Sequence, residues 1–270
     1  MILSKALIES EYEKLGHTLG WRFLTCPEQN ISTATTALVT INPGGSSYEP
    51  PAWSVESGSA YVVESWKDYA PGQEKLQLQV QRMFQVMGMK PEQVLSGYLV
   101  PFRSSGWAEL PRKSESLRFG ASLWREVFKR ANIDTVVSFG KDTATYMAEL
   151  LEAEREVPLP AGWGSLTIDR YRFGTGGRLI VIPHLSRFGL FGRPNSESQF
   201  RTAMELIETP QIGNVPAVRT GRFSPIIRLL VSANPKRGKS RFRFDCYRDG
   251  MTVAATNLGC VVLPQACRSK

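Results

Sequence analysis

The sequence predicts an α/β protein in which helices cover both faces of a parallel sheet. Short apolar runs that are typical of buried strands occur at residues 36–41, 95–100, 134–139 and 178–183. Between these runs, apolar residues recur at helical spacing. Strands that alternate with helices favour a parallel sheet, because each crossover to a parallel neighbour needs a long connection.

The individual elements follow from these patterns. In chain order, the predicted strands read TALVTI, LSGYLV, DTVVSF and RLIVIP, and each is short and bounded by polar or turn-forming residues. The predicted helices carry these apolar repeats: Leu76, Val80, Met83, Phe84 and Met87; Leu117, Ala121, Trp124, Phe128 and Ala131; Thr143, Met147, Leu150 and Leu151; Phe200, Ala203, Met204 and Ile207. We therefore expect residues 1 to 210 to form a three-layer α/β/α sandwich with a central four-stranded parallel sheet.

Composition narrows the class of protein. Of the 270 residues, 42% are hydrophobic and 21% are charged, which suits a chain that buries a proper core. No apolar run approaches the roughly 20 residues that a membrane span needs, so we expect no membrane contact and a cytoplasmic location. The four cysteines show no C-x-x-C spacing, and the chain lacks the phosphate-binding and dinucleotide-binding glycine motifs. We expect no metal and no cofactor.

Positive charge is concentrated at the end of the chain. Residues 211 to 270 hold 11 of the 33 Lys and Arg residues but only 2 of the 25 Asp and Glu residues. We expect this segment to be a basic extension that binds nucleic acid through its phosphates and includes a β-hairpin around the loop ANPKRGK. The DNA-binding candidates in it are Lys236, Arg237, Lys239, Arg241 and Arg243. The alternative is a solubilising extension.

The residues that follow the predicted strands are candidates for a binding site. In open α/β sheets, ligands bind beyond the carboxyl ends of the strands. The segments found there are residues 42–47, 101–105, 140–142 and 184–187, which include Asn42, a Gly-Gly pair and His184. The only other histidine, His17, lies on a predicted N-terminal helix and is expected to be a surface or packing residue. This edge of the sheet is therefore the predicted site.

Two segments of the chain resemble motifs of the uracil-DNA glycosylase superfamily. TINPGG at residues 40–45 is similar to its first motif, G-[QIM]-[DN]-P-[YG], and HLSRFGLFG at residues 184–192 is similar to its second motif, which begins near H-P-S or N-P-S. The resemblance covers roughly residues 30 to 208. In this chain Thr40 replaces the leading Gly and Leu185 replaces the Pro of H-P-S. Asn42, where the uracil enzymes carry Asp, matches the mismatch-specific thymine/uracil branch.

The resemblance implies a monofunctional DNA glycosylase that hydrolyses the N-glycosidic bond of a flipped base in double-stranded DNA and leaves an abasic site. Asn42 would position the attacking water, and His184 would donate a hydrogen bond to O2 of the departing pyrimidine. Gly44 stands where strict uracil enzymes carry Tyr, so the pocket would admit larger groups at pyrimidine C5. The expected substrates are uracil, mismatched thymine or a bulky modified cytosine such as glucosylated hydroxymethylcytosine in phage DNA, with a role in repair or antiviral defence.

The remaining site residues complete this expectation. Those expected to contact the substrate are Gly44, Gly45, Tyr48, Phe102 and Ser186, with Phe102 stacking on the base or else packing in the core. Those expected to contact DNA outside the extension are Arg103, Lys141, Arg187, Phe188 and Leu190, the last three in a loop that enters the minor groove.

Three alternatives stand beside the glycosylase. The first is a catalytically inert DNA-binding protein on the same fold, which the departures at Thr40 and Leu185 favour and the presence of Asn42 and His184 disfavours. The second, a lyase that forms a Schiff base, would need Lys141 to be desolvated. The third is a hydrolase of free nucleotides or nucleosides, which would not need the basic extension.

Overall fold

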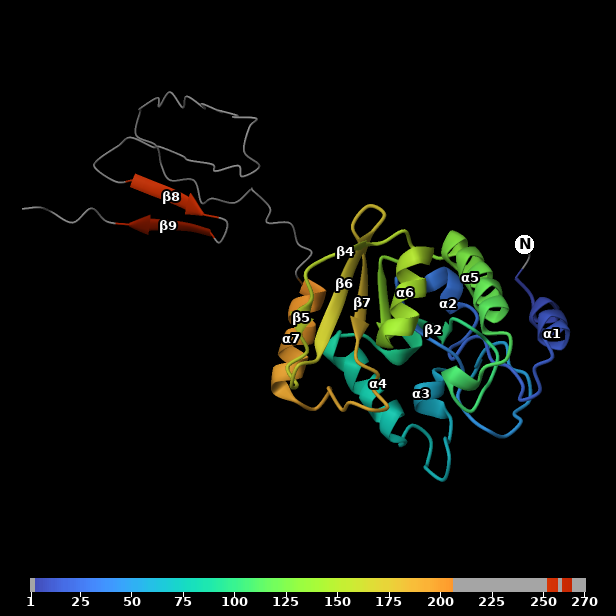
Figure 1. Cartoon of the computed structure of the whole chain (residues 1–270). Helices are drawn as coiled ribbons and strands as arrows, with labels where there is room; N and C mark the ends of the chain where they lie inside the picture. Colours follow the sequence, from blue (N-terminus) through green and yellow to red (C-terminus); the bar gives the residue numbers. More distant parts are fainter. Residues whose placement is uncertain (1–2, 206–251, 257–258, 264–270) are drawn as a thin grey trace, which may run out of the picture. The chain divides into compact units, whose positions relative to one another are not determined.

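The computed structural model describes residues 3–205, 252–256 and 259–263. The chain divides into two compact units, Met1–Gln211 and Ile212–Lys270. The first unit is an α/β structure built on a mixed, seven-stranded sheet with helices packed around it (Figure 1). Its described helices are α1 Lys5–Lys14, α2 Asn30–Thr33, α3 Ala60–Val63, α4 Lys75–Val86, α5 Lys113–Arg130, α6 Gly140–Leu150 and α7 Pro194–Glu205, with short 3-10 helices at Pro91–Gln93 and Trp107–Glu109.

Neighbouring strands in one part of the sheet are paired in parallel, in the order β2-β1-β3-β7. Their bounds are β1 Thr36–Thr40, β2 Val94–Tyr98, β3 Thr135–Phe139 and β7 Gly177–Ile182. They coincide with the predicted strands to within two residues at each end. Their register aligns Val39 with Ser138 and Ser138 with Val181, so the carboxyl ends of β1, β3 and β7 lie level.

The sheet is larger than the four-stranded parallel sheet that the sequence predicts. Strand β6, Thr167–Phe173, pairs antiparallel with β7, and the short strands β4, Glu154–Arg155, and β5, Leu159–Pro160, pair antiparallel with β6. The α/β class is confirmed, whereas the expectation of a purely parallel sheet of four strands is wrong. Strand β6 was not predicted because its sequence, TIDRYRF, carries three charged residues and lacks a continuous apolar run.

Alternate residues of the parallel strands enter two different hydrophobic cores, as the two-residue period of a strand requires. Ala37, Val39 and Val136 belong to the core that α5 and α6 cover. Leu38 and Val137 belong to the core that α4 and α7 cover. The sheet is thus covered by helices on both faces (Figure 1).

Local contacts explain where α4 begins and how closely α5 packs. The first turn of α4 is capped by Glu74, whose side chain accepts a hydrogen bond from the Leu76 amide at 2.6 Å. Gln77 completes this capping box by accepting the backbone N–H of Glu74 at 3.0 Å. On α5, a Cβ at Gly120 would lie 2.1 Å from the carbonyl oxygen of Leu99, so this glycine lets the helix pack closely on the chain that follows β2.

In the second unit, the described strands β8, Thr252–Thr256, and β9, Gly259–Leu263, form an antiparallel pair. The hairpin predicted around the loop ANPKRGK lies outside the described residues, as do the five basic residues expected to bind DNA there. Of the helices that the structure describes, none is long and apolar enough to cross a membrane.

Candidate functional site

Asn42 and His184 lie at the same edge of the sheet. Val39 of β1 and Val181 of β7 are both paired with Ser138 of β3, so these three residues lie at one level in the sheet. Asn42 and His184 each come three residues after that level, Asn42 on the chain of β1 and His184 on the chain of β7. Strand β3 lies between them in the sheet, so the two chains are separated by about 10 Å at a spacing of about 4.8 Å per strand. The fold therefore places the two residues expected to be catalytic at the same edge of the sheet, on either side of the end of β3.

The side-chain amide of Asn42 is held in one orientation. Its Nδ2 donates to the carbonyl oxygens of Pro43 at 3.1 Å and Phe102 at 3.2 Å, and to Oγ of Ser104 at 2.8 Å. A flipped amide would aim its oxygen at two carbonyl oxygens, which is unfavourable, so the contacts fix the nitrogen on this side. Among the described residues, none donates a hydrogen bond to Oδ1. That oxygen is left to accept one from a water or a ligand.

His184 is held in the tautomer that carries its proton on Nε2. The backbone N–H of Ser186 donates to Nδ1 at 3.3 Å, and Oγ of Ser186 lies 2.7 Å from the same nitrogen. An amide N–H can only donate, so Nδ1 is the acceptor and Nε2 carries the hydrogen. Burial, and then the charge of Arg187, lower the pKa of His184 from its usual 6.5. The imidazole is therefore neutral at pH 7 and offers one N–H donor.

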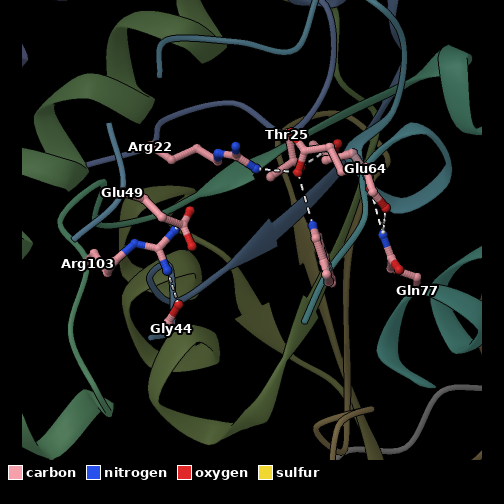
Figure 2. A network of polar contacts seen from close by, with 10 residues as sticks. Arg22, Thr25, Gly44, Glu49, Glu64, Gln77 and Arg103 are labelled. Atoms are coloured by element: carbon pink, nitrogen blue, oxygen red, sulfur yellow. Dashed lines mark hydrogen bonds and ion pairs between the residues drawn. The ribbon is translucent and has the colours of Figure 1, made fainter. Parts of the chain in front are cut away.

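The loops that follow β1 and β2 are joined to each other by backbone hydrogen bonds. The Ser104 amide donates to the Pro43 carbonyl at 3.2 Å, and the Gly45 amide donates to the Ser104 carbonyl at 3.0 Å. Figure 2 shows the Arg103 side chain reaching both the Gly44 carbonyl and the Glu49 carboxylate. We call residues 42–45 together with residues 102–106 the loop clamp. This clamp fixes the backbone that carries Asn42.

The two glycines of the clamp differ in what surrounds them. A Cβ on Gly44 would meet nothing within 4 Å, so the space beside this exposed residue is open. Gly45 has φ +136°, and a Cβ there would lie 2.5 Å from Nη1 of Arg103. The bare backbone at Gly45 thus accommodates a guanidinium of the protein itself.

A second polar cluster in the same view was not anticipated from the sequence. Arg22 forms an ion pair with Glu64 at 2.6 Å (Figure 2). The same carboxylate oxygen accepts the indole N–H of Trp66 at 3.0 Å. Nε2 of Gln77, in the first turn of α4, donates to the Glu64 carbonyl at 2.8 Å. These contacts connect the segment before β1 to α4, and no short motif in the sequence marks them.

The structure places three predicted site residues inside the protein, and these roles need correction. Phe102 is fully buried, with its ring stacked between His17 at 4.2 Å and Phe119 at 5.7 Å, so neither ring face is free to stack on a base. Leu190 is 2% exposed and belongs to a hydrophobic core, so it does not project toward a minor groove. Arg103 is 7% exposed and is engaged by the clamp rather than by solvent. His17, expected to be a surface or packing residue, is a packing residue.

Other predicted residues lie at the surface. Ser186, Arg187 and Lys141 are exposed, and Tyr48, in the segment between β1 and α3, is 60% exposed. Phe188 is half-buried, with its ring edge-on to that of Trp163 at 5.7 Å. Sequence reasoning missed Trp163, which also has the guanidinium of Arg193 4.1 Å above its ring.

Two surface hollows lie away from this edge. One is bordered by α4 and the turn that follows it, and the other by residues that precede β1 and β2, at the amino ends of the strands. Neither is lined by Asn42 or His184. The polar groups at the carboxyl ends of β1 and β7, rather than a hollow, therefore define the candidate site.

Comparison of the chain with protein-family models and with curated proteins finds no match. Among the residues that the structure describes, no group of three or more His, Cys, Asp or Glu side chains gathers in a way that would hold a metal ion. The functional argument consequently depends on the geometry of Asn42 and His184.

Proposed function

We propose that this chain is a monofunctional DNA glycosylase. It hydrolyses the N-glycosidic bond of a deaminated or C5-modified pyrimidine that has been flipped out of the duplex, and it leaves an abasic site. One observation carries the proposal. A hydrogen-bond acceptor on Asn42 and a neutral N–H donor on His184 occur at the same edge of the sheet.

The oriented amide of Asn42 supports the role of holding the attacking water. Its Oδ1 accepts a hydrogen bond from water, so the water oxygen can approach C1′ of the deoxyribose. The bond between C1′ and the base nitrogen breaks and its electron pair leaves with the base. A bond forms between C1′ and the water oxygen, and the proton that this oxygen loses passes to solvent or to the departing base. Because the sugar resembles an oxocarbenium ion at that point, an uncharged amide that positions the water is sufficient, and no strong base is needed.

The neutral imidazole of His184 supports the complementary role. Negative charge develops on the departing pyrimidine, and much of it resides on O2. A donor held in a fixed tautomer stabilises that charge without needing to reorient during the reaction. The lowered pKa of His184 keeps this donor neutral through the physiological range.

The open space beside Gly44 supports the acceptance of groups at pyrimidine C5. A side chain there would project into that space, as the Tyr of strict uracil enzymes does in the motif that this segment resembles. The substrates that fit are uracil, mismatched thymine and bulky modified cytosines. Arg187 and Lys141, both exposed at this edge, supply positive charge for the flanking phosphates.

A catalytically inert DNA-binding protein on the same fold is the second candidate. The observation that favours it is the burial of Phe102, because the ring expected to stack on the flipped base is occupied in the core. In that case the exposed basic residues would bind duplex DNA without excision.

The test is a cleavage assay on matched duplexes that carry uracil, a thymine mismatch, 5-hydroxymethylcytosine or its glucosylated form. Alkali treatment then breaks the strand at each abasic site. We expect cleavage on at least one substrate, lost in Asn42→Ala and His184→Ala. The matched control is Ser47→Ala, an exposed residue of the same loop, which should keep full activity.

The outcomes separate the two candidates. Cleavage that depends on Asn42 and His184 supports the glycosylase and identifies its base. Binding to all four duplexes without cleavage of any supports the inert DNA-binding protein. Cleavage that persists in both variants would place the chemistry elsewhere and overturn the assignment of this site.

A further inference from the structure

The hydroxyl of Ser104 takes part in two hydrogen bonds that fix its polarity. Its Oγ accepts the Nδ2–H of Asn42 at 2.8 Å and donates to the carbonyl oxygen of Gly106 at 2.8 Å. A hydroxyl has a single proton, and a carbonyl oxygen can only accept, so that proton lies toward Gly106. The lone pairs of Oγ are thereby turned toward Asn42.

We propose that Ser104 is a positioning residue that, together with the carbonyl groups of Pro43 and Phe102, sets which end of the Asn42 amide faces the substrate. The proposal rests on the proposed function, because the amide orientation matters for the chemistry only if Oδ1 holds the attacking water. Ser104 is 2% exposed, so its hydroxyl is shielded from bulk solvent. With the proton directed to Gly106, only the nitrogen end of the amide can approach Oγ favourably.

Ser104 is distinct among the three acceptors that hold Nδ2. The Pro43 and Phe102 acceptors are backbone carbonyls, at 3.1 and 3.2 Å, and no side-chain substitution removes them. Ser104 provides the shortest of the three contacts and the one side chain among them. Its own backbone also pairs with Pro43 and Gly45 on the facing loop, so the hydroxyl is placed by the clamp itself.

The inference predicts a specific effect of Ser104→Ala. Loss of the shortest of the three contacts holds the amide less firmly against the two remaining carbonyl acceptors, which lowers kcat about tenfold, the kinetic equivalent of one hydrogen bond. KM should change less than about twofold, because Ser104 is buried and does not offer its side chain to the surface. Ser104→Thr, which retains the hydroxyl, should recover most of kcat. Ser105→Ala, at the exposed neighbouring position, is the matched control and should match the wild type.

A second readout is independent of activity. The Nδ2 protons of Asn42 can be identified in the proton–nitrogen NMR spectrum of the full chain by their loss in Asn42→Ala. In the wild type they should exchange slowly with solvent, since three acceptors hold the group. In Ser104→Ala they should exchange markedly faster, and in Ser105→Ala they should not.

The two readouts distinguish the two proposals. A lower kcat together with faster exchange in Ser104→Ala supports the positioning role. Unchanged kcat and unchanged exchange overturn it and leave the glycosylase proposal intact. If the wild type cleaves no substrate, the proposed function fails, and faster exchange in Ser104→Ala still supports Ser104 as the group that orients the amide. If Ser104→Thr does not fold, the comparison of the two alanine variants decides the question.

Discussion

The guanidinium of Arg103 occupies the space in which a side chain on Gly45 would have to lie. A Cβ at Gly45 would stand 2.5 Å from Nη1 of Arg103, and the backbone there has φ +136°, a conformation that L-residues rarely adopt. Arg103 is in turn held by the Gly44 carbonyl and by Glu49. The glycine and the buried arginine thus require each other, and together they shape the loop that carries Asn42.

Substitution of Gly45 by Ala should therefore destabilise the protein. We expect the free energy of unfolding to fall by about 1–3 kcal/mol, because the new Cβ must displace Arg103 and the backbone is strained. Denaturant unfolding measures this. Gly44→Ala is the control, since its Cβ would meet nothing within 4 Å, and it should change stability by less than about 0.5 kcal/mol. Equal effects at the two positions would contradict the close approach of Arg103.

The arginines at positions 103 and 187 should affect different properties. Arg103→Gln removes a buried group that binds Gly44 and Glu49, so it should lower the free energy of unfolding by about 1–3 kcal/mol. Arg187→Gln alters an exposed residue and should leave stability unchanged. It should instead reduce the salt slope of DNA binding by about 0.9, the value for one phosphate contact. A reduced salt slope in Arg103→Gln without loss of stability would show that Arg103 contacts DNA after all.

The parallel strands could be predicted from the sequence, whereas the antiparallel strands could not, and the difference has a physical reason. Strands β1 and β3 are buried at every position, and they carry no charged residue and only small hydroxyl side chains beside their apolar ones. Strand β6 lies farther from the centre of the sheet and exposes part of its length, so Asp169 and Arg172 interrupt the apolar pattern. Such a strand is identified by the strands with which it pairs, and this pairing cannot be read from the local sequence.

The candidate site was also predictable only in part. The rule that ligands bind beyond the carboxyl ends of strands located Asn42 and His184. The rule does not say toward which side a residue in those loops points. Phe102 turns into the core because Trp21, from a distant part of the chain, pairs with it across an isolated bridge and His17 stacks on its ring. Such long-range packing partners leave no local signal, and the same holds for the contact of Ser104 with Asn42.

His17 should make the stability of the protein depend on pH. Burial lowers its pKa from 6.5 to about 4, and its Nδ1 is buried without a hydrogen-bond partner among the described residues. Between these values the unfolded chain binds a proton that the folded chain does not. Stability is therefore fully present above pH 6.5 and declines as the pH falls toward about 4, by on the order of 3 kcal/mol.

The measurement is the free energy of unfolding between about pH 4 and pH 8 in the wild type and in His17→Phe. The substituted ring can still stack on Phe102 but cannot bind a proton. The variant should lose less stability than the wild type as the pH falls, and the difference between the two curves should develop below pH 6.5. His184→Gln serves as a control that removes the contribution of the second histidine. Parallel curves for the wild type and His17→Phe would show that His17 does not titrate as its burial implies.

The contacts of Asn42 predict that Asp cannot replace it, although the uracil enzymes carry Asp at the matching motif position. In Asn42→Asp, a carboxylate oxygen would face the carbonyl oxygens of Pro43 and Phe102 and the lone pairs of Ser104. This repulsion raises the pKa of the introduced carboxyl group above the value of about 3.9 that is usual for aspartate. Because the folded variant then holds its proton to higher pH than the unfolded chain, its stability relative to the wild type falls as pH rises from about 4 to 7. We expect a loss of about 1–3 kcal/mol at pH 7, together with a loss of base excision.

Asn42→Ala provides the comparison for that experiment, because it removes the amide without introducing a charge. Its stability relative to the wild type should not depend on pH over the same range, whereas that of Asn42→Asp should. If Asn42→Asp is as stable as the wild type at pH 7 and retains excision, the acceptors around position 42 must rearrange readily. The fixed amide orientation would then not be the feature on which water positioning depends.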